Sequence, residues 1–190
     1  MQQASEETKG GMAAVIGKTE DEIRGILKEL NLEGQVELVN FNCPGQIVLA
    51  GGEQALSLLQ QHSKQARLRV MRLPVSGAFH SQAMRGVSEE LEQYINELIF
   101  HSSSFALYSN VTALPYEEQS MKETLAMQTS RPVLFEQTIR NMQQAGVNAF
   151  IELGPGTALS GFVKRIDKEA QVVHVEDYDS YLATLQALGL

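Results

Sequence analysis

The stretch VELVNFNCPGQIVLAG, residues 36–51, predicts the centre of the fold. Residues 36–41 and 46–51 are rich in valine, isoleucine and leucine, residue types that favour or tolerate extended strands. Residues 42–45, NCPG, combine asparagine, proline and glycine, which are common in turns for separate steric reasons. Two such runs joined by a short turn indicate a β-hairpin.

The segments on either side of this hairpin alternate in type. Thr19 followed by Glu22 predicts a capping box that starts a helix. Helical spacing of apolar residues returns after the hairpin, and the next segment alternates charged with apolar residues, as a half-buried strand does. The order β-α-β-β-α-β indicates a ferredoxin-like domain over residues 12–74. Its elements are expected at residues 12–17, 19–30, 36–41, 46–51, 53–65 and 67–75.

A second pattern begins near residue 75. Residues 81–98 carry apolar residues at helical spacing and predict a long amphipathic helix. Strands and helices then alternate, which implies an α/β arrangement with a parallel sheet. Strands are expected at residues 105–110, 148–153 and 171–176, and helices near residues 119–129, 133–145, 157–168 and 178–188.

The composition argues against several classes of protein. The 190 residues carry a formal charge of −8, and phosphate binding needs a basic face, so a nucleic-acid surface is not expected. Cys43 is the single cysteine, which fits a reducing compartment and no disulfide framework. Residues 1–15 contain no apolar run of the kind found in signal peptides or membrane anchors. We therefore expect a cytoplasmic protein without a metal site or a membrane partner.

His80 is the first candidate for a chemical role. It stands in PVSGAFHS, residues 74–81, directly before the predicted long helix. Imidazole groups titrate near neutral pH, so a histidine presented there can act as a general base or acid. A histidine at a helix start can equally be an ordinary capping or surface residue, and the local sequence leaves both interpretations open.

Three further features have two interpretations each. The glycine-rich turn GPG, residues 154–156, lies between a strand and a helix, where backbone N–H groups can bind an anion or glycine can simply permit a tight turn. Cys43 is either a nucleophile or a packing residue in the hairpin. A short basic segment is either a solvated strand face or a docking patch for an acidic partner. Its residues are Lys64, Arg67, Arg69 and Arg72.

Several separated motifs form one larger pattern: NFNCPGQIVLAG (40–51), LPVSGAFHS (73–81), YSNVT (108–112), QTSRPV (128–133) and ELGPGTALSGFVKRI (152–166). In this order they resemble the malonyl-CoA:acyl-carrier-protein transacylases of fatty acid synthesis and the acyltransferase domains of polyketide synthases. The resemblance covers nearly the whole chain. It corresponds to a C-terminal portion of that family.

The resemblance implies an α/β-hydrolase-like domain, here incomplete, with an inserted ferredoxin-like small domain, in agreement with the element order above. Residues 1–11 would be the remnant of a large-domain helix, residues 12–74 the small domain and residues 75–190 the C-terminal part of the large domain. The implied enzyme is an acyltransferase that moves malonyl from malonyl-CoA to the pantetheine thiol of acyl carrier protein. It uses no cofactor of its own.

The resemblance also assigns roles to individual residues. His80 matches the family's catalytic histidine. Gln128 matches the glutamine whose main-chain carbonyl orients that histidine, which is the third role in a catalytic triad. Phe79 matches the aromatic residue that accompanies a preference for malonyl over bulkier methylmalonyl units.

The sequence departs from the family in its nucleophile. The family carries a serine on a G-x-S-x-G elbow, and this pattern occurs nowhere in the 190 residues. The glutamine loop of the oxyanion hole and the arginine that binds the malonyl carboxylate are missing too, and Gln82 and Ala83 replace a usual Pro-Leu pair. We therefore expect the chain to be inactive alone and to need a missing N-terminal segment or a partner chain. A non-catalytic module that binds carrier protein is the alternative.

Overall fold

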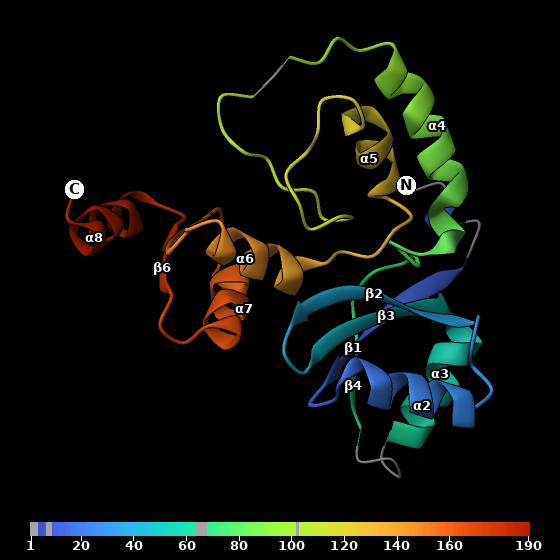
Figure 1. Cartoon of the computed structure of the whole chain (residues 1–190). Coiled ribbons are helices and arrows are strands. Elements are labelled where there is room, and N and C mark those ends of the chain that lie inside the picture. The colour runs from blue at the N-terminus through green and yellow to red at the C-terminus, as the bar shows by residue number, and fades with distance from the viewer. Residues whose placement is uncertain (1–3, 7–8, 64–67, 102) are drawn as a thin grey trace. The chain divides into compact units, whose positions relative to one another are not determined.

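The computed structural model describes residues 4–6, 9–63, 68–101 and 103–190 of the chain. By its internal contacts the chain divides into two compact units, Met1–Thr138 and Ile139–Leu190. Each unit combines helices with strands, so the α/β class is confirmed (Figure 1). Within the described residues no helix has both the length and the apolar character needed to cross a membrane.

The first unit contains a four-stranded antiparallel sheet with the strand order β2-β3-β1-β4. The predicted hairpin is confirmed, with Leu38 opposite Leu49 and Phe41 opposite Ile47. The predicted capping box is present too, because the Thr19 and Glu22 side chains each accept a hydrogen bond from the other residue's backbone N–H. The elements are β1 (Gly10–Ile16), α2 (Glu20–Glu29), β2 (Val36–Cys43), β3 (Gln46–Gly52), α3 (Glu53–Ser63) and β4 (Arg69–Arg72).

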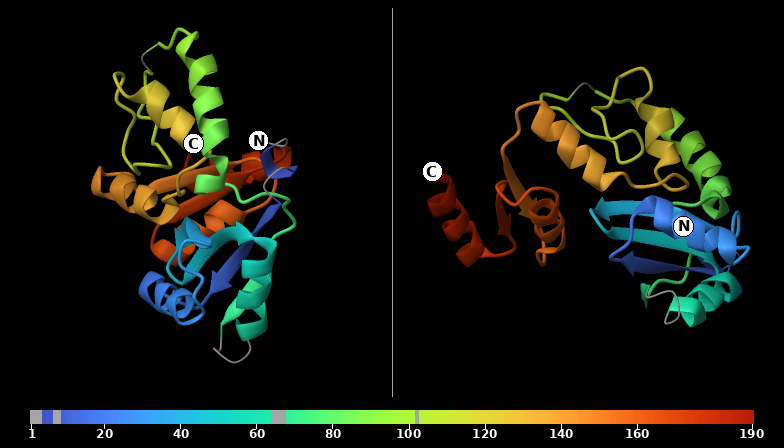
Figure 2. Two further views of the ribbon diagram at one scale, coloured as in Figure 1. Left: turned by 90° about the vertical axis from the view of Figure 1, so that its right-hand side faces the viewer. Right: turned by 60° about the horizontal axis from the view of Figure 1, so that its bottom comes forward.

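Both faces of this sheet bury apolar side chains, because residues along each strand point alternately to the two sides. Helices α2 and α3 cover one face, as Figures 1 and 2 show, and Ile23 and Leu56 are almost fully buried there. The other face has its own cluster, which includes Ala78 and the partly buried Phe79. The segment that leads to His80 is therefore anchored on the second face of the sheet.

The long helix predicted after His80 is shorter in the structure than the sequence indicates. The helix expected over 81–98 starts with a separate 3₁₀ turn, Gln82–Met84, and α4 covers only Arg85–Asn96. Ser81 causes this start, because its hydroxyl accepts the Ala83 N–H and caps the turn. Helix α5 (Met121–Met127) packs against α4, where the Ser88 hydroxyl donates to the Ala126 carbonyl at 2.8 Å.

The prediction of a strand at residues 105–110 is wrong, because this stretch forms no strand in the structure. Only an isolated bridge between Tyr108 and Pro115 forms, and the side chains of Phe105 and Leu107 are 69% and 42% exposed. A strand needs a neighbour to accept and donate its backbone hydrogen bonds. Among the described residues this stretch bonds with the segment around Pro115, and Asn110 accepts the Leu134 N–H, but neither neighbour is a strand.

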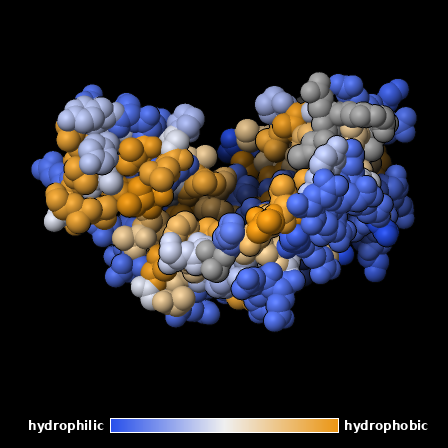
Figure 3. Space-filling model, turned by 90° about the horizontal axis from the view of Figure 1, so that it is seen from above, coloured by the Kyte–Doolittle hydropathy of each residue, from blue (hydrophilic) through white to orange (hydrophobic). Residues whose placement is uncertain are grey.

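The second unit contains the predicted parallel pair of strands, β5 (Ala149–Leu153) and β6 (Gln171–Val175). Parallel strands are normally buried on both faces. Here Ile151 and Leu153 are 48% and 77% exposed, and Figure 3 shows apolar side chains on the surface of this unit. The helices that accompany the strands are α7 (Ala158–Ile166) and α8 (Tyr178–Leu188), and α6 (Phe135–Gln144) precedes them across the boundary between the units.

Glu22 stabilises the first unit in its ionised form. Hydrogen bonds from Lys18 and then from Thr19 lower the pKa of its carboxyl from 4.5 to about 2. A carboxyl with a depressed folded-state pKa stabilises the fold above its unfolded-state pKa and loses that contribution as the pH falls through the folded-state value. We expect Glu22→Gln to be less stable than the parent at neutral pH, and the difference to vanish as the pH falls from 4.5 to about 2.

Urea denaturation across this pH range measures the effect. Glu29→Gln is the matched control, because Glu29 lies on the same helix and its side chain makes no hydrogen bond or ion pair with any described residue. A stability difference between Glu22→Gln and the parent that stayed constant with pH would contradict the assignment.

Candidate active site

The segment before His80 packs closely on the sheet. Ala78 is 3% exposed, and a Cβ added to Gly10 on strand β1 would lie 2.8 Å from the Ala78 Cβ. Only a glycine on β1 allows the segment to approach this closely. Phe79 packs on the same apolar cluster, so its ring is partly buried against the sheet.

His80 has a strained backbone. Its φ of 61° lies in the left-handed region, which costs a non-glycine residue about 1–2 kcal/mol. The conformation is held by the His80 N–H, which donates to the Thr129 carbonyl at 3.0 Å, and by the Ser81 hydroxyl, which donates to the Ala78 carbonyl at 2.6 Å. Strained residues held by several independent bonds occur often at active sites.

The imidazole of His80 meets the predicted partner. Its Nδ1 lies 2.7 Å from the main-chain oxygen of Gln128, across 48 positions of sequence. A carbonyl oxygen can only accept, so Nδ1 carries the proton of this hydrogen bond. In a neutral ring Nε2 then has a free lone pair and can accept a proton.

The loop that presents the Gln128 carbonyl is fixed to strand β2. The Val133 N–H donates to the Val39 carbonyl at 2.8 Å, and the Phe41 N–H donates to the Val133 carbonyl at 2.9 Å. Both bonds are made to β2, the first strand of the predicted hairpin. The acceptor for His80 is thus tied to the same sheet that anchors the segment before His80.

Asn110 is a residue of this site that sequence reasoning did not identify. Its side-chain amide donates to the Gln128 side-chain oxygen at 3.0 Å, and its carbonyl accepts the Leu134 N–H at 2.9 Å. Asn110 therefore contacts the residues at both ends of the 128–134 loop. Asn110 belongs to the YSNVT motif, but that motif alone does not predict a contact with Gln128, which lies 18 positions further along the chain.

The other candidates lie outside this group. Arg69 is exposed, whereas Arg72 forms an ion pair with Glu53 and is half-buried. Lys64 and Arg67 fall outside the described residues. Cys43 is 1% exposed. Among the described residues no group of three or more histidine, cysteine or carboxylate side chains is placed to hold a metal ion.

The GPG turn is occupied by the chain's own carboxylates. Glu152 on β5 accepts the N–H groups of Leu159 and Ser160 at the start of α7, at 3.1 and 2.7 Å. Glu176 accepts the N–H of Gly156 at 2.6 Å. These internal anions take the positions where a phosphate would bind a helix N-terminus. The structure therefore favours the structural interpretation of this turn.

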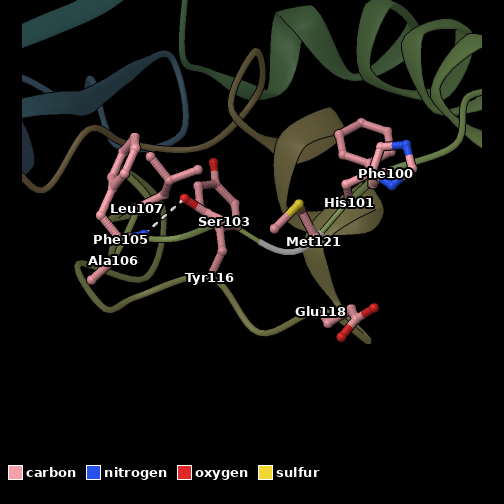
Figure 4. Close-up of a pocket in the computed structure, with 9 residues that line it drawn as sticks. All are labelled: Phe100, His101, Ser103, Phe105, Ala106, Leu107, Tyr116, Glu118 and Met121. Atoms are coloured by element: carbon pink, nitrogen blue, oxygen red, sulfur yellow. Dashed lines mark hydrogen bonds between the residues drawn. The ribbon is translucent and has the colours of Figure 1, made fainter.

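A cavity of about 180 Å³ lies elsewhere in the first unit (Figure 4). Neither His80 nor Gln128 is among the described residues that line it. The lining residues are Phe100, His101, Ser103, Phe105, Ala106, Leu107, Tyr116, Glu118 and Met121. Burial raises the pKa of the Tyr116 phenol, and a hydrogen bond with Ser109 only partly offsets this, so the phenol stays neutral at physiological pH. The lining of this cavity therefore does not include the His80–Gln128 pair.

Comparisons with known proteins agree on one family. The acyl transferase domain family matches residues 1–180. The chain is 34% identical to the malonyl CoA-acyl carrier protein transacylase of Bacillus subtilis strain 168, over 99% of this chain and 60% of that protein. The crystal structure of the transacylase of the same name from Clostridium perfringens is similar with a TM-score of 0.92 and 39% identity, over 100% of this chain and 60% of that one.

A further solved structure contains a type II PKS acyl-carrier protein in complex with its malonyl-transacylase. It matches with a TM-score of 0.88 and 29% identity, over 97% of this chain and 62% of that one. The chain thus spans about 60% of the length of the relatives it matches.

The ionised Glu152 side chain should stabilise the second unit. Burial alone would raise the pKa of its carboxyl, but hydrogen bonds from Ser160 and Leu159 outweigh this and leave the pKa below its usual value. We expect Glu152→Gln to lower the free energy of unfolding by up to about 1 kcal/mol at neutral pH, because the charge that faces the helix N-terminus is lost. The deficit should shrink as the pH falls below the usual carboxyl pKa of 4.5 and the parent also loses the charge.

Thermal or urea unfolding monitored on the second unit tests this expectation. Glu92→Gln on α4 is the control, since the Glu92 side chain is exposed and has no hydrogen-bond or ion-pair partner among the residues that the structure describes. Equal stability of Glu152→Gln and the parent at neutral pH would show that the carboxylate does not cap α7.

Proposed function

The chain belongs to the acyl transferase domain family, and we propose that it supplies the histidine part of the active site of an [acyl-carrier-protein] S-malonyltransferase. The hydrogen bond between His80 Nδ1 and the Gln128 carbonyl carries this proposal, since it leaves Nε2 free as a base. The named relatives support the choice of malonyl-CoA as donor and acyl carrier protein as acceptor.

The proposed chemistry needs a serine that lies outside these 190 residues. As the serine oxygen attacks the thioester carbonyl of malonyl-CoA, His80 Nε2 takes the hydroxyl proton. The C–S bond then breaks, and the departing thiolate of coenzyme A takes that proton from the imidazolium. In the second half the pantetheine thiol of the carrier protein gives its proton to Nε2 as its sulfur attacks the malonyl-serine ester. The ester C–O bond then breaks, the serine oxygen takes that proton from the imidazolium, and malonyl leaves on the carrier's sulfur.

The chain alone should therefore be inactive. Without a serine on a G-x-S-x-G elbow there is no covalent intermediate, and each missing oxyanion-hole donor costs about 10²–10³ in rate. A base without a nucleophile transfers no acyl group. The exposed Ile151 and Leu153 of the parallel pair support the view that the fold, like the site, is completed from outside these residues.

The proposed domain structure follows the family. We propose that residues 12–74 form the inserted ferredoxin-like domain, which the element order and the strand order β2-β3-β1-β4 support. Residues 1–11 and 75–190 would then belong to an incomplete α/β-hydrolase-like domain. The parallel pairing of β5 with β6 supports this assignment.

Two further roles belong to the proposal. The role of Phe79 rests on the family resemblance, and the role of the basic segment rests on its local charge. Phe79 would border the acyl unit and disfavour methylmalonyl, although its ring packs partly on the sheet. Carrier-protein docking on the basic segment would depend mainly on Arg69 among its described residues, because Arg72 is paired with Glu53. This pairing weakens the alternative of a non-catalytic carrier-binding module.

A chimera tests the proposal. The N-terminal part of the Bacillus subtilis relative is joined to this chain, and malonyl transfer from malonyl-CoA to carrier protein is measured. We expect transfer by the chimera, none by the 190-residue chain, and a fall of about 10³-fold in kcat/KM for the His80→Ala chimera, which lacks the base. His62→Ala is the control, because His62 lies on α3 and, within the described part of the chain, its side chain bonds only the Leu58 carbonyl.

A folded chimera without transfer activity would contradict the proposal. Activity that survives His80→Ala, or transfer by the unjoined chain, would do so as well. Circular dichroism of each protein establishes that it is folded.

A further inference from the structure

Glu37 on strand β2 contacts the loop that follows His80. Its two carboxylate oxygens lie 3.1 and 3.3 Å from the backbone nitrogen of Gln82, across 45 positions of sequence. The backbone of Glu37 is held in the sheet opposite Ala50 of strand β3. A carboxylate that accepts a backbone N–H forms a charge-assisted hydrogen bond, which is stronger than a neutral one.

The direction of the Glu37 side chain fits this contact. Val36 and Leu38 belong to the core cluster under α2 and α3. Side chains alternate along a strand, so Glu37 lies on the opposite face, where Ala78 also packs. Glu37 thus reaches the His80 loop from the same face of the sheet that anchors the segment before His80.

The contact completes a set of bonds around the strained residue. The His80 N–H is bound to Thr129, and Gln82, two positions further along, is bound to Glu37. Strand β2 also holds Val133, whose loop presents the acceptor carbonyl for the imidazole. One strand therefore fixes both the loop that carries the imidazole and the loop that carries its partner.

We propose that Glu37 is a positioning residue for His80. From β2 it holds the Gln82 N–H, and this keeps the His80 ring where Nδ1 donates to the Gln128 carbonyl. Its value for catalysis rests on the proposed function, in which Nε2 must be the free nitrogen. Glu37 itself touches no reacting atom.

Two single variants remove the same bond from its two ends. Glu37→Ala deletes the acceptor. Gln82→Pro deletes the donor, because proline has no N–H, and the site accepts proline since Gln82 is the first residue after the cap and Ser81 is extended, with φ −117° and ψ 173°. Glu37→Gln is the conservative variant, because its amide oxygen can still accept.

The measurement is the tautomer of His80 in the 190-residue chain. Nitrogen-15 chemical shifts of the neutral ring report which nitrogen carries the proton, and the His80 signals are assigned by their loss in His80→Ala. We expect the Nδ1–H form to dominate in the parent and in Glu37→Gln. In Glu37→Ala and in Gln82→Pro the ratio of Nδ1–H to Nε2–H should fall by roughly 3- to 10-fold, the effect of losing one solvent-exposed hydrogen bond.

The double variant separates positioning from general damage. If both changes act through one bond, Glu37→Ala combined with Gln82→Pro should shift the ratio no further than either single change. Unchanged tautomer ratios in both folded single variants, or additive shifts in the double variant, would overturn the proposal. If Glu37→Ala does not fold, the tautomer ratio of Gln82→Pro alone tests the positioning role, since that substitution leaves the sheet unchanged.

No acyl transfer enters this measurement, so the two proposals fail independently. An inactive chimera would leave the tautomer result standing. A tautomer ratio of His80 that did not change in the Glu37 variants would leave the proposal of malonyl transfer unaffected.

Discussion

The two backbone hydrogen bonds between Val133 and strand β2 are the constraint on which the site depends. They fix the 128–134 loop, so that the Gln128 carbonyl stands where a strained His80 can donate to it. A left-handed backbone at a non-glycine residue persists only where its surroundings determine it several times over. Here the sheet holds the His80 backbone through three contacts: the hydrogen bonds to Val133, the packing of Ala78 and the hydrogen bond from Gln82 to Glu37.

Local signals in the sequence predicted most elements correctly. The hairpin and the Thr19 capping box were found because a few adjacent residues determine each of them. The strand at residues 105–110 was wrong because strand formation depends on a neighbouring strand, which β-propensity cannot supply. The long helix started late because Ser81 caps a 3₁₀ turn first.

The site was predicted in part for a similar reason. Resemblance of motifs pointed to His80 and Gln128, and the structure brings their atoms together. Asn110 and Glu37 were missed because their contacts join residues 18 and 45 positions apart, and no local pattern encodes such a contact. The anion-binding interpretation of the GPG turn is disfavoured, because Glu176 accepts the Gly156 N–H and Glu152 accepts the N–H groups at the start of α7.

Amide hydrogen exchange tests the central claim most directly, because it reports which backbone hydrogen bonds open together. If Val133 and β2 hold the site, the amide of His80 should be protected to within about tenfold of the amides of Phe41 and Val133, since one opening would release all of them. Fast exchange at His80 beside a protected Phe41 would show that the histidine moves independently of the sheet and would contradict this account.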